Sequence, residues 1–340
     1  MNERELQDAV NQLPKSIEPP RDLWPGIEAR LATGAGGAGG PGGRFASWRR
    51  RWYWVPLAAA AVFAFLLIAR AERSAWDVTA LAGRPLIGTR RLAASGRLRV
   101  GDWLQTDDSS RALIAVGRIG QVEVRPDTRL QLVVAKANEH RLSLARGTID
   151  AKVDAVPRLF FVETPAGTAI DLGCAYTLET DSLGKGLLHV TAGEVEFQTG
   201  SHSSRVPLGA LVQIRPTTGP GIPYVDGAPA PFVRALIAFD FEPRGTRARA
   251  IRTVLALARS QDALSLWHLL QRVDPSLRGV VYDRLAALVA PPPGVTRRGA
   301  VALESRALEG YWTKIQRIHF RIMVLRGVRE IDPRTGLAKP

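Results

Sequence analysis

The sequence has little of the chemistry that cross-links a fold or holds a metal ion. Cys174 is the single cysteine among 340 residues, so no disulfide can form within the chain. A structural zinc site needs a cluster of Cys and His ligands, and the sequence contains no such cluster. We therefore expect no metal and no cofactor.

Histidines are equally sparse. The five of them stand at positions 140, 189, 202, 268 and 319, at no spacing typical of a catalytic triad or a metal site. Glu194 and Glu196 share one face of a predicted strand, and that face is expected to be exposed to solvent. No set of residues has the pattern of a catalytic centre, so the chain is predicted not to be an enzyme.

One long uncharged hydrophobic run is present, at residues 52–69 (WYWVPLAAAAVFAFLLIA). As a helix it would extend about 27 Å, close to the roughly 30 Å of a bilayer's hydrocarbon core. Arg49, Arg50 and Arg51 precede it, so the positive-inside rule places residues 1–51 in the cytoplasm and the following residues outside it. The alternatives are a buried core helix and a cleaved signal peptide. The run's apolar length disfavours the first, and the long segment before it disfavours the second.

Residues 1–33 are predicted to form two short amphipathic helices on the cytoplasmic side. Asp22 can cap the second helix. Helices this short cannot bury a core of their own, so the apolar side of the second is the expected contact surface for a partner. That side carries Leu23, Trp24, Ile27 and Leu31. The stretch 34–51 is rich in Gly and Arg and is predicted to be a flexible linker. It is not expected to be a phosphate-binding loop, because it lacks the Lys-Ser/Thr pair of such a loop.

Residues 19–31 (PPRDLWPGIEARL) resemble the short segment that precedes the membrane span in the cytoplasmic domains of bacterial anti-sigma factors. The resemblance implies that this segment holds or releases a sigma factor. Many relatives carry a zinc-binding His and Cys set before the segment, whereas here no His or Cys precedes residue 140. Any zinc-binding anti-sigma fold is therefore expected to be absent or degenerate here.

Residues 85–216 are predicted to form an all-β domain. Ten short apolar or alternating runs follow one another, separated by Gly, Asp, Asn and Pro, which is typical of a sandwich, a barrel or a short β-solenoid. The predicted strands lie at residues 112–116, 121–125, 129–134, 141–145, 148–153, 159–164, 176–180, 187–191, 194–198 and 211–215. Glycines such as Gly101 and Gly147 are expected to mark turns with positive φ. Trp103 and Cys174 are expected to be buried.

Six segments of this region, in consecutive order, resemble the FecR family of periplasmic regulatory domains. They lie at residues 101–116, 124–132, 144–153, 160–180, 187–198 and 206–214. The resemblance implies a FecR-like β domain in a single-pass regulator of the bacterial inner membrane, with its C-terminal domains in the periplasm. It also implies that a periplasmic receptor or another envelope component is the partner of this domain.

After a Pro/Gly linker at residues 217–233, residues 234–330 are predicted to form a basic helical domain. Residues 241–340 contain eighteen Lys or Arg against eight Asp or Glu, which is +10 of the chain's net +14. The arginines alternate with apolar positions, which is typical of a helix face exposed to solvent. The alternative interpretation is that they contact anionic lipid headgroups. Nucleic acid is not expected as a partner, because this segment is predicted to lie outside the cytoplasm.

Two functions of different classes follow from these patterns. The first is a transmembrane regulator whose outer domain binds a signal or a partner while its N-terminal helices control a sigma factor. The second is a non-signalling envelope scaffold, or a glycan- or protein-binding module, anchored in the inner membrane. The cytoplasmic segment 1–33 discriminates between them.

Overall fold

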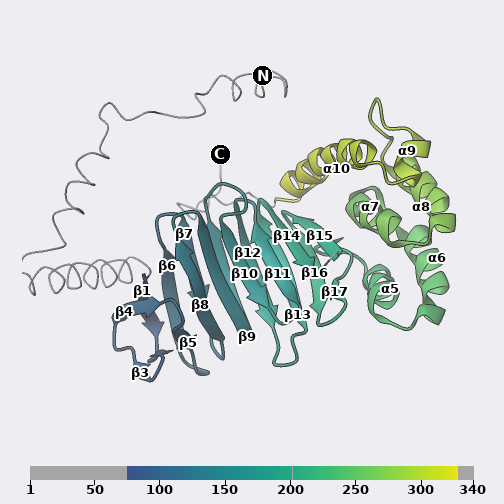
Figure 1. Ribbon diagram of the computed structural model, residues 1–340. Helices are drawn as coiled ribbons and strands as arrows, with labels where there is room; N and C mark the ends of the chain where they lie inside the picture. The colour runs from purple at the N-terminus through teal and green to yellow at the C-terminus, as the bar shows by residue number, and fades with distance from the viewer. Residues whose placement is uncertain (1–74, 201, 328–340) are drawn as a thin grey trace, which may run out of the picture. The chain divides into compact units, whose positions relative to one another are not determined.

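The computed structural model describes residues 75–200 and 202–327 (Figure 1). The predicted cytoplasmic helices, the linker 34–51 and the hydrophobic run 52–69 lie outside these residues. Among the residues that are described, no helix is both long enough and apolar enough to cross a bilayer. The predicted arrangement of a mainly β domain followed by C-terminal helices is confirmed.

The strands pair into two sheets that share one long strand, β9 (Glu139–Val153). The first sheet has the order β4 (Ser95–Arg99), β1 (Ala75–Ala82), β6 (Arg111–Val116), β7 (Gly120–Val124), β9, β12 (Cys174–Thr180), β13 (Gly186–Ala192) and β16 (Ala210–Arg215), with the short strands β17 (Gly219–Pro220) and β18 (Tyr224–Val225) paired to β16. The second has the order β3 (Arg90–Arg91), β2 (Leu86–Ile87), β5 (Trp103–Gln105), β8 (Arg129–Lys136), β9, β10 (Phe160–Thr164), β11 (Gly167–Asp171), β14 (Glu194–Thr199) and β15 (His202–Pro207).

The inner faces of both sheets bury one common hydrophobic core. In β6 and β7 of the first sheet and in the first half of β8 of the second, every second side chain is buried, as the period-two pattern of the sequence predicts. Ile114, Val122 and Leu130 from these strands have no exposed surface. Alternation of apolar and polar residues along these strands therefore fixes which face of each sheet is inside.

Strand β9 corrects one sequence-based expectation. The runs 141–145 and 148–153 were expected to be separate strands with a turn at Gly147, but they form a single strand of 15 residues. Its first half pairs with β8 and β10 in the second sheet, and from Gly147 onward it pairs with β7 and β12 in the first. Gly147 has φ +99°, so its positive φ marks the crossing between sheets and not a chain reversal.

In the described part of the chain, six α-helices follow the sheets. They are α5 (Ala230–Phe241), α6 (Arg247–Leu257), α7 (Ala263–Arg272), α8 (Pro275–Leu288), α9 (Arg297–Val301) and α10 (Ser305–Leu325). Figure 1 shows them gathered beside β15, β16 and β17. Pro275 occupies the first turn of α8, where its missing amide hydrogen costs least, and Asp274 before it makes no side-chain hydrogen bond at the helix start.

Replacing Gly147 with alanine tests the role of the β9 crossing. A Cβ at this position would lie 2.3 Å from Thr128 Oγ1 and 2.4 Å from Thr128 Cα. Backbone strain and steric overlap together predict that Gly147→Ala lowers the free energy of unfolding by about 3 kcal/mol. Gly101 is the matched control, because its φ of +93° is similar and a Cβ there meets open space. Gly101→Ala should cost only about 1 kcal/mol, and equal losses in thermal or denaturant unfolding would contradict this account.

Candidate functional site

Strand β15 forms an edge of the second sheet, and helix α7 supplies hydrogen-bond partners for two of its backbone groups. The amide of Arg205 donates to Nε2 of His268 at 3.1 Å. The carbonyl of Ser203, two residues earlier, accepts from Nη2 of Arg272 at 3.1 Å. Side chains of α7 therefore take the place of a further strand and close an edge that would otherwise be free to pair.

Arg272 joins the helices to the sheets through four acceptors. Its Nη1 donates to the carbonyl of Pro220 at 3.0 Å and to Oδ1 of Asp240 at 3.2 Å. Its Nη2 also donates to Oγ of Ser204 at 2.6 Å. The second carboxylate oxygen of Asp240 accepts from the amide of Ile222 at 2.6 Å. Burial raises the pKa of Asp240, while the charge of Arg272 opposes that shift. Asp240 and Arg272 thus form a largely buried ion pair at the junction of sheets and helices.

His268 is neutral in this arrangement. Its Nδ1 lies 2.8 Å from the carbonyl of Leu264 and donates to it, so Nε2 is left to accept the Arg205 amide. The side chain is buried, and burial lowers the pKa of His268 to about 3. Trp267 and Trp312 pack edge-on against the imidazole. A proton on Nε2 would remove the acceptor of the β15 edge.

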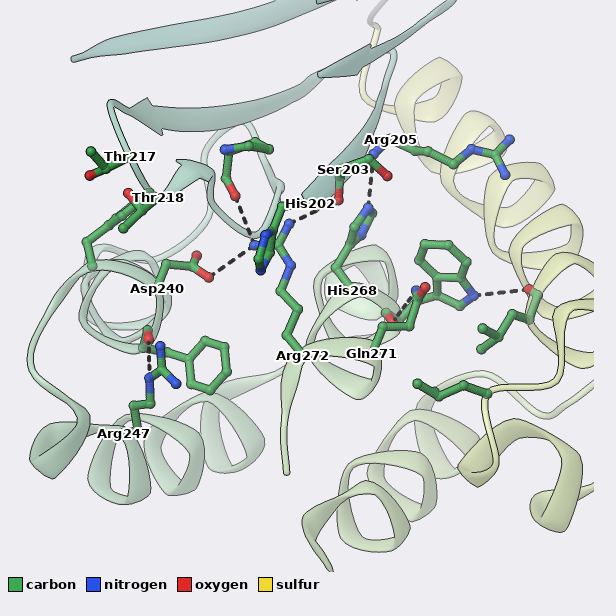
Figure 2. Close-up of a pocket in the computed structure, with 16 residues that line it drawn as sticks. His202, Ser203, Arg205, Thr217, Thr218, Asp240, Arg247, His268, Gln271 and Arg272 are labelled. Atoms are coloured by element: carbon green, nitrogen blue, oxygen red, sulfur yellow. Dashed lines mark hydrogen bonds and ion pairs between the residues drawn. The ribbon is translucent and has the colours of Figure 1, made fainter. Parts of the chain in front are cut away.

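A cavity of about 720 Å³ opens at this junction (Figure 2). Its lining comes from β15, β17 and the turn before it, and helices α5, α6 and α7, with Leu303 and Leu308 added from the start of the α10 region. Polar side chains predominate in it: His202, Ser203, Arg205, Thr217, Thr218, Asp240, Arg247, His268, Gln271 and Arg272. A cavity of this size and polarity suits a hydrophilic small molecule better than an apolar one.

The three arginines of the cavity differ in how many hydrogen bonds and ion pairs they make within the protein. Arg272 is fully engaged by the acceptors named above. Arg205 is shared between Glu194, at 2.6 Å, and Glu309, at 3.0 Å. Arg247 donates only from Nε, to the carbonyl of Phe239 at 3.2 Å, and its guanidinium lies over the Phe239 ring. Within the part of the chain that the structure describes, the two terminal amino groups of Arg247 have no hydrogen-bond partner.

The turn between β16 and β17 carries backbone strain at the mouth of the cavity. Thr217 has φ +65°, in the left-handed region that β-branched residues strongly avoid. Conformations of this kind cost about 1–3 kcal/mol and cluster at ligand sites. The strain marks this turn as part of the candidate site.

The outer face of β14 is covered, contrary to expectation. Glu194 and Glu196 were expected to face solvent, but their side chains are only 12% and 17% exposed. Arg205 and Gln316, the latter from α10, donate to Glu194, and Arg158 donates to Glu196. Helix α10 therefore packs on this face. The period-two pattern predicted the inner face of β14 correctly, but it could not show that another element covers the outer face.

Cys174 is fully buried, as predicted. Its Sγ donates to Oδ2 of Asp171 at 2.8 Å, and the amide of Gly173 donates to Oδ1 at 2.7 Å. Burial raises the pKa of Asp171 to about 7, and it also raises the pKa of the thiol. A thiol that stays protonated is a poor nucleophile, so this pair is a structural contact.

Other residues singled out in the sequence fall into two groups. The predicted partner-binding residues Leu23, Trp24, Ile27 and Leu31 lie outside the described residues. Trp103 was expected in the core, but it is only half-buried, with the Arg129 guanidinium 4.2 Å from its ring centre. In residues 75–200 and 202–327, no three potential metal ligands come together.

A pH titration of stability tests the neutral state of His268. The unfolded chain binds a proton near pH 6.5, whereas folded His268 does so only near pH 3, so this group's contribution to stability is lost as the pH falls below 6.5. The loss should approach about 1.4 kcal/mol per pH unit between pH 6 and 4. His268→Gln should remove this component, because glutamine can accept the Arg205 amide without titrating.

The measurement is the difference in unfolding free energy between the two proteins as a function of pH. Asp171, whose raised pKa makes it stabilising as the pH falls, is present in both proteins and cancels in the difference. A difference that does not change between pH 7 and 4 would contradict a neutral, buried His268.

Comparison with known proteins gives few matches. No protein family model matches the sequence, and no curated protein matches it. Two crystal structures of a protein from Parabacteroides distasonis, each named "putative anti-sigma factor", are similar to 40% of this chain, with 14% sequence identity and a TM-score of 0.33. The match covers 64% and 63% of those chains, less than two thirds of their length. A TM-score this low supports no inference about function.

Proposed function

We propose that this chain is a membrane-anchored, FecR-like regulator that binds a signal with its outer domain and controls a sigma factor with its N-terminal segment. In this proposal residues 52–69 cross the bacterial inner membrane once, residues 1–51 are cytoplasmic and the domains after the span are periplasmic. Leu23, Trp24, Ile27 and Leu31 contact the sigma factor. The protein is a binding module and not an enzyme.

One observation carries the proposal, namely the position of the cavity. It lies where helices α5, α6 and α7 meet β15 and the β16–β17 turn. A ligand there would touch both parts of the outer domain and so change how firmly they hold each other. A signal receptor needs such a link between occupancy and structure, whereas a passive scaffold does not.

A second candidate, the anchored envelope scaffold, is favoured by a different surface. Helix α10 and the Pro292–Pro293 segment border a groove of about 560 Å³ that includes Lys314, Arg317 and Arg321. Phe320 and Val324, on the same helix, are about half exposed. Basic and apolar side chains together suit a surface of anionic lipid headgroups, so in this alternative the C-terminal helices hold the domain on an envelope membrane.

Capture of a sigma factor separates the two candidates. The full chain, tagged at its C-terminus, should retain a sigma factor of its host after solubilisation. Trp24→Asp places a charge in the apolar contact and should weaken retention about 30-fold, the equivalent of about 2 kcal/mol at a central interface residue. Ala38→Asp, in the Gly-rich linker, is the matched control and should have no effect. Retention that is absent in the wild type, or equal in Trp24→Asp, would rule out the regulator.

Topology is tested independently of any partner. Alkaline phosphatase fused after Pro340 should be active in cells, because it folds only in the oxidising periplasm. A fluorescent protein that matures only in the cytoplasm, fused at the same position, should stay dark. Replacing Arg49, Arg50 and Arg51 with glutamate should reduce the phosphatase signal, since these residues set the orientation. The opposite pair of signals in the wild type would overturn the proposed arrangement.

A further inference from the structure

The charge of the cavity is not balanced. Arg205, Arg247 and Arg272 line it, and Asp240 is the single carboxylate among its lining residues. Arg272 forms the ion pair with Asp240, and Arg247 attracts the same carboxylate only at longer range, without an ion pair. His268 is neutral because burial lowers its pKa to about 3. Arg205 is compensated by two glutamates that do not line the cavity. The excess positive charge therefore belongs to Arg247.

Arg247 is held ready for an anion. The hydrogen bond from Nε to the Phe239 carbonyl and the contact with the Phe239 ring, 5.4 Å from the guanidinium carbon, fix the orientation of the side chain. The two terminal amino groups, without a partner in the described residues, form the planar fork that matches a carboxylate or a phosphate. A guanidinium positioned in advance loses little conformational entropy on binding.

Further polar groups are available around this charge. Gln271 donates to the carbonyl of Trp267 at 3.0 Å, which leaves its amide oxygen able to accept. Thr218 is exposed, lines the cavity from the β16–β17 turn beside the strained Thr217, and can offer its hydroxyl to a ligand. Figure 2 shows Thr218 above Asp240 and Arg247 below it, and these groups line the same cavity from different elements. They suit the hydroxyl groups of a ligand better than its apolar parts.

We propose that this cavity binds a small organic anion, with the carboxylate or phosphate of the ligand on Arg247 and its hydroxyl groups on Thr218 and Gln271. The volume of about 720 Å³ lies within the roughly 300–1,000 Å³ of metabolite sites and far exceeds what an inorganic ion fills. The further step, that this anion is the signal, rests on the proposed function. Binding itself is tested without a sigma factor.

The probes are citrate for the carboxylate, glucose 6-phosphate for the phosphate, and glucose as a neutral comparator. Titration calorimetry and thermal unfolding are measured on the purified full chain in detergent. At least one of the two anions should bind and raise the unfolding temperature, with an affinity that falls as salt is added, and glucose should do neither. The anion that binds identifies the group that Arg247 recognises.

Variants then locate the site. Arg247→Gln should weaken the bound anion about 10- to 100-fold, the range expected for loss of a charged hydrogen-bond pair. Arg252→Gln removes the same charge from an exposed position on the same helix and should change the affinity less than about twofold. Thr218→Val provides a second test that leaves the helices untouched, and it should weaken binding about 3- to 10-fold.

Several outcomes would overturn the inference: no binding of either anion, equal binding of glucose, or an affinity that Arg247→Gln and Thr218→Val leave unchanged. If no sigma factor is captured but the anion binds, the regulator proposal is wrong and the anion site is retained. If a sigma factor is captured but no anion binds, the anion site is wrong and the regulator proposal is retained.

Discussion

The free edge of β15 is the constraint on which the described part of the molecule depends. The sheets pair β15 with β14 on one side, and the backbone groups on its other side must find partners that do not come from another chain. His268 and Arg272 supply partners for two of these groups, the Arg205 amide and the Ser203 carbonyl, from one helix, α7, and the carboxylate of Asp240 holds Arg272 in place. Removing either side chain would leave buried polar groups without partners, which costs about 1–3 kcal/mol for each group. The helices are thus a necessary part of the β domain's boundary.

The sequence predicted the strands where the local pattern was sufficient. In β7, β8 and β14, the run of alternating apolar and polar residues is long enough to define a buried face. The predicted ends of these strands agree with the structure to within one or two residues. At Gly147 the prediction was wrong, because a positive-φ glycine between two apolar runs is the same signal for a hairpin and for a strand that crosses between sheets. The two are distinguished by the pairing partners β7, β8, β10 and β12, and pairing is not a local property.

The residues of the cavity could not be found in this way. Arg205, Arg247 and Arg272 are single arginines in a chain that has many, and on the sequence each fits a solvated surface. Their different roles follow from neighbours far along the chain: Glu309 for Arg205, and Pro220 and Asp240 for Arg272. The sequence around Thr218 did not mark it as a site residue, since a threonine followed by glycine is common in ordinary turns. The four apolar residues predicted to contact a partner, from Leu23 to Leu31, remain predictions.

The cavity and the closed edge share their residues, and this determines what binding can do. Arg272 and Arg205 line the cavity and also take part in the contact between α7 and β15. A ligand shifts a structural equilibrium only by the difference between its affinities for the two states. An anion held between α6 and the β16–β17 turn interacts fully only when the helices are docked on the sheet, so its binding energy adds to the hydrogen bonds of Arg272 and His268. Occupancy and docking are therefore coupled through one set of contacts, and the coupling needs no pathway of other residues between them.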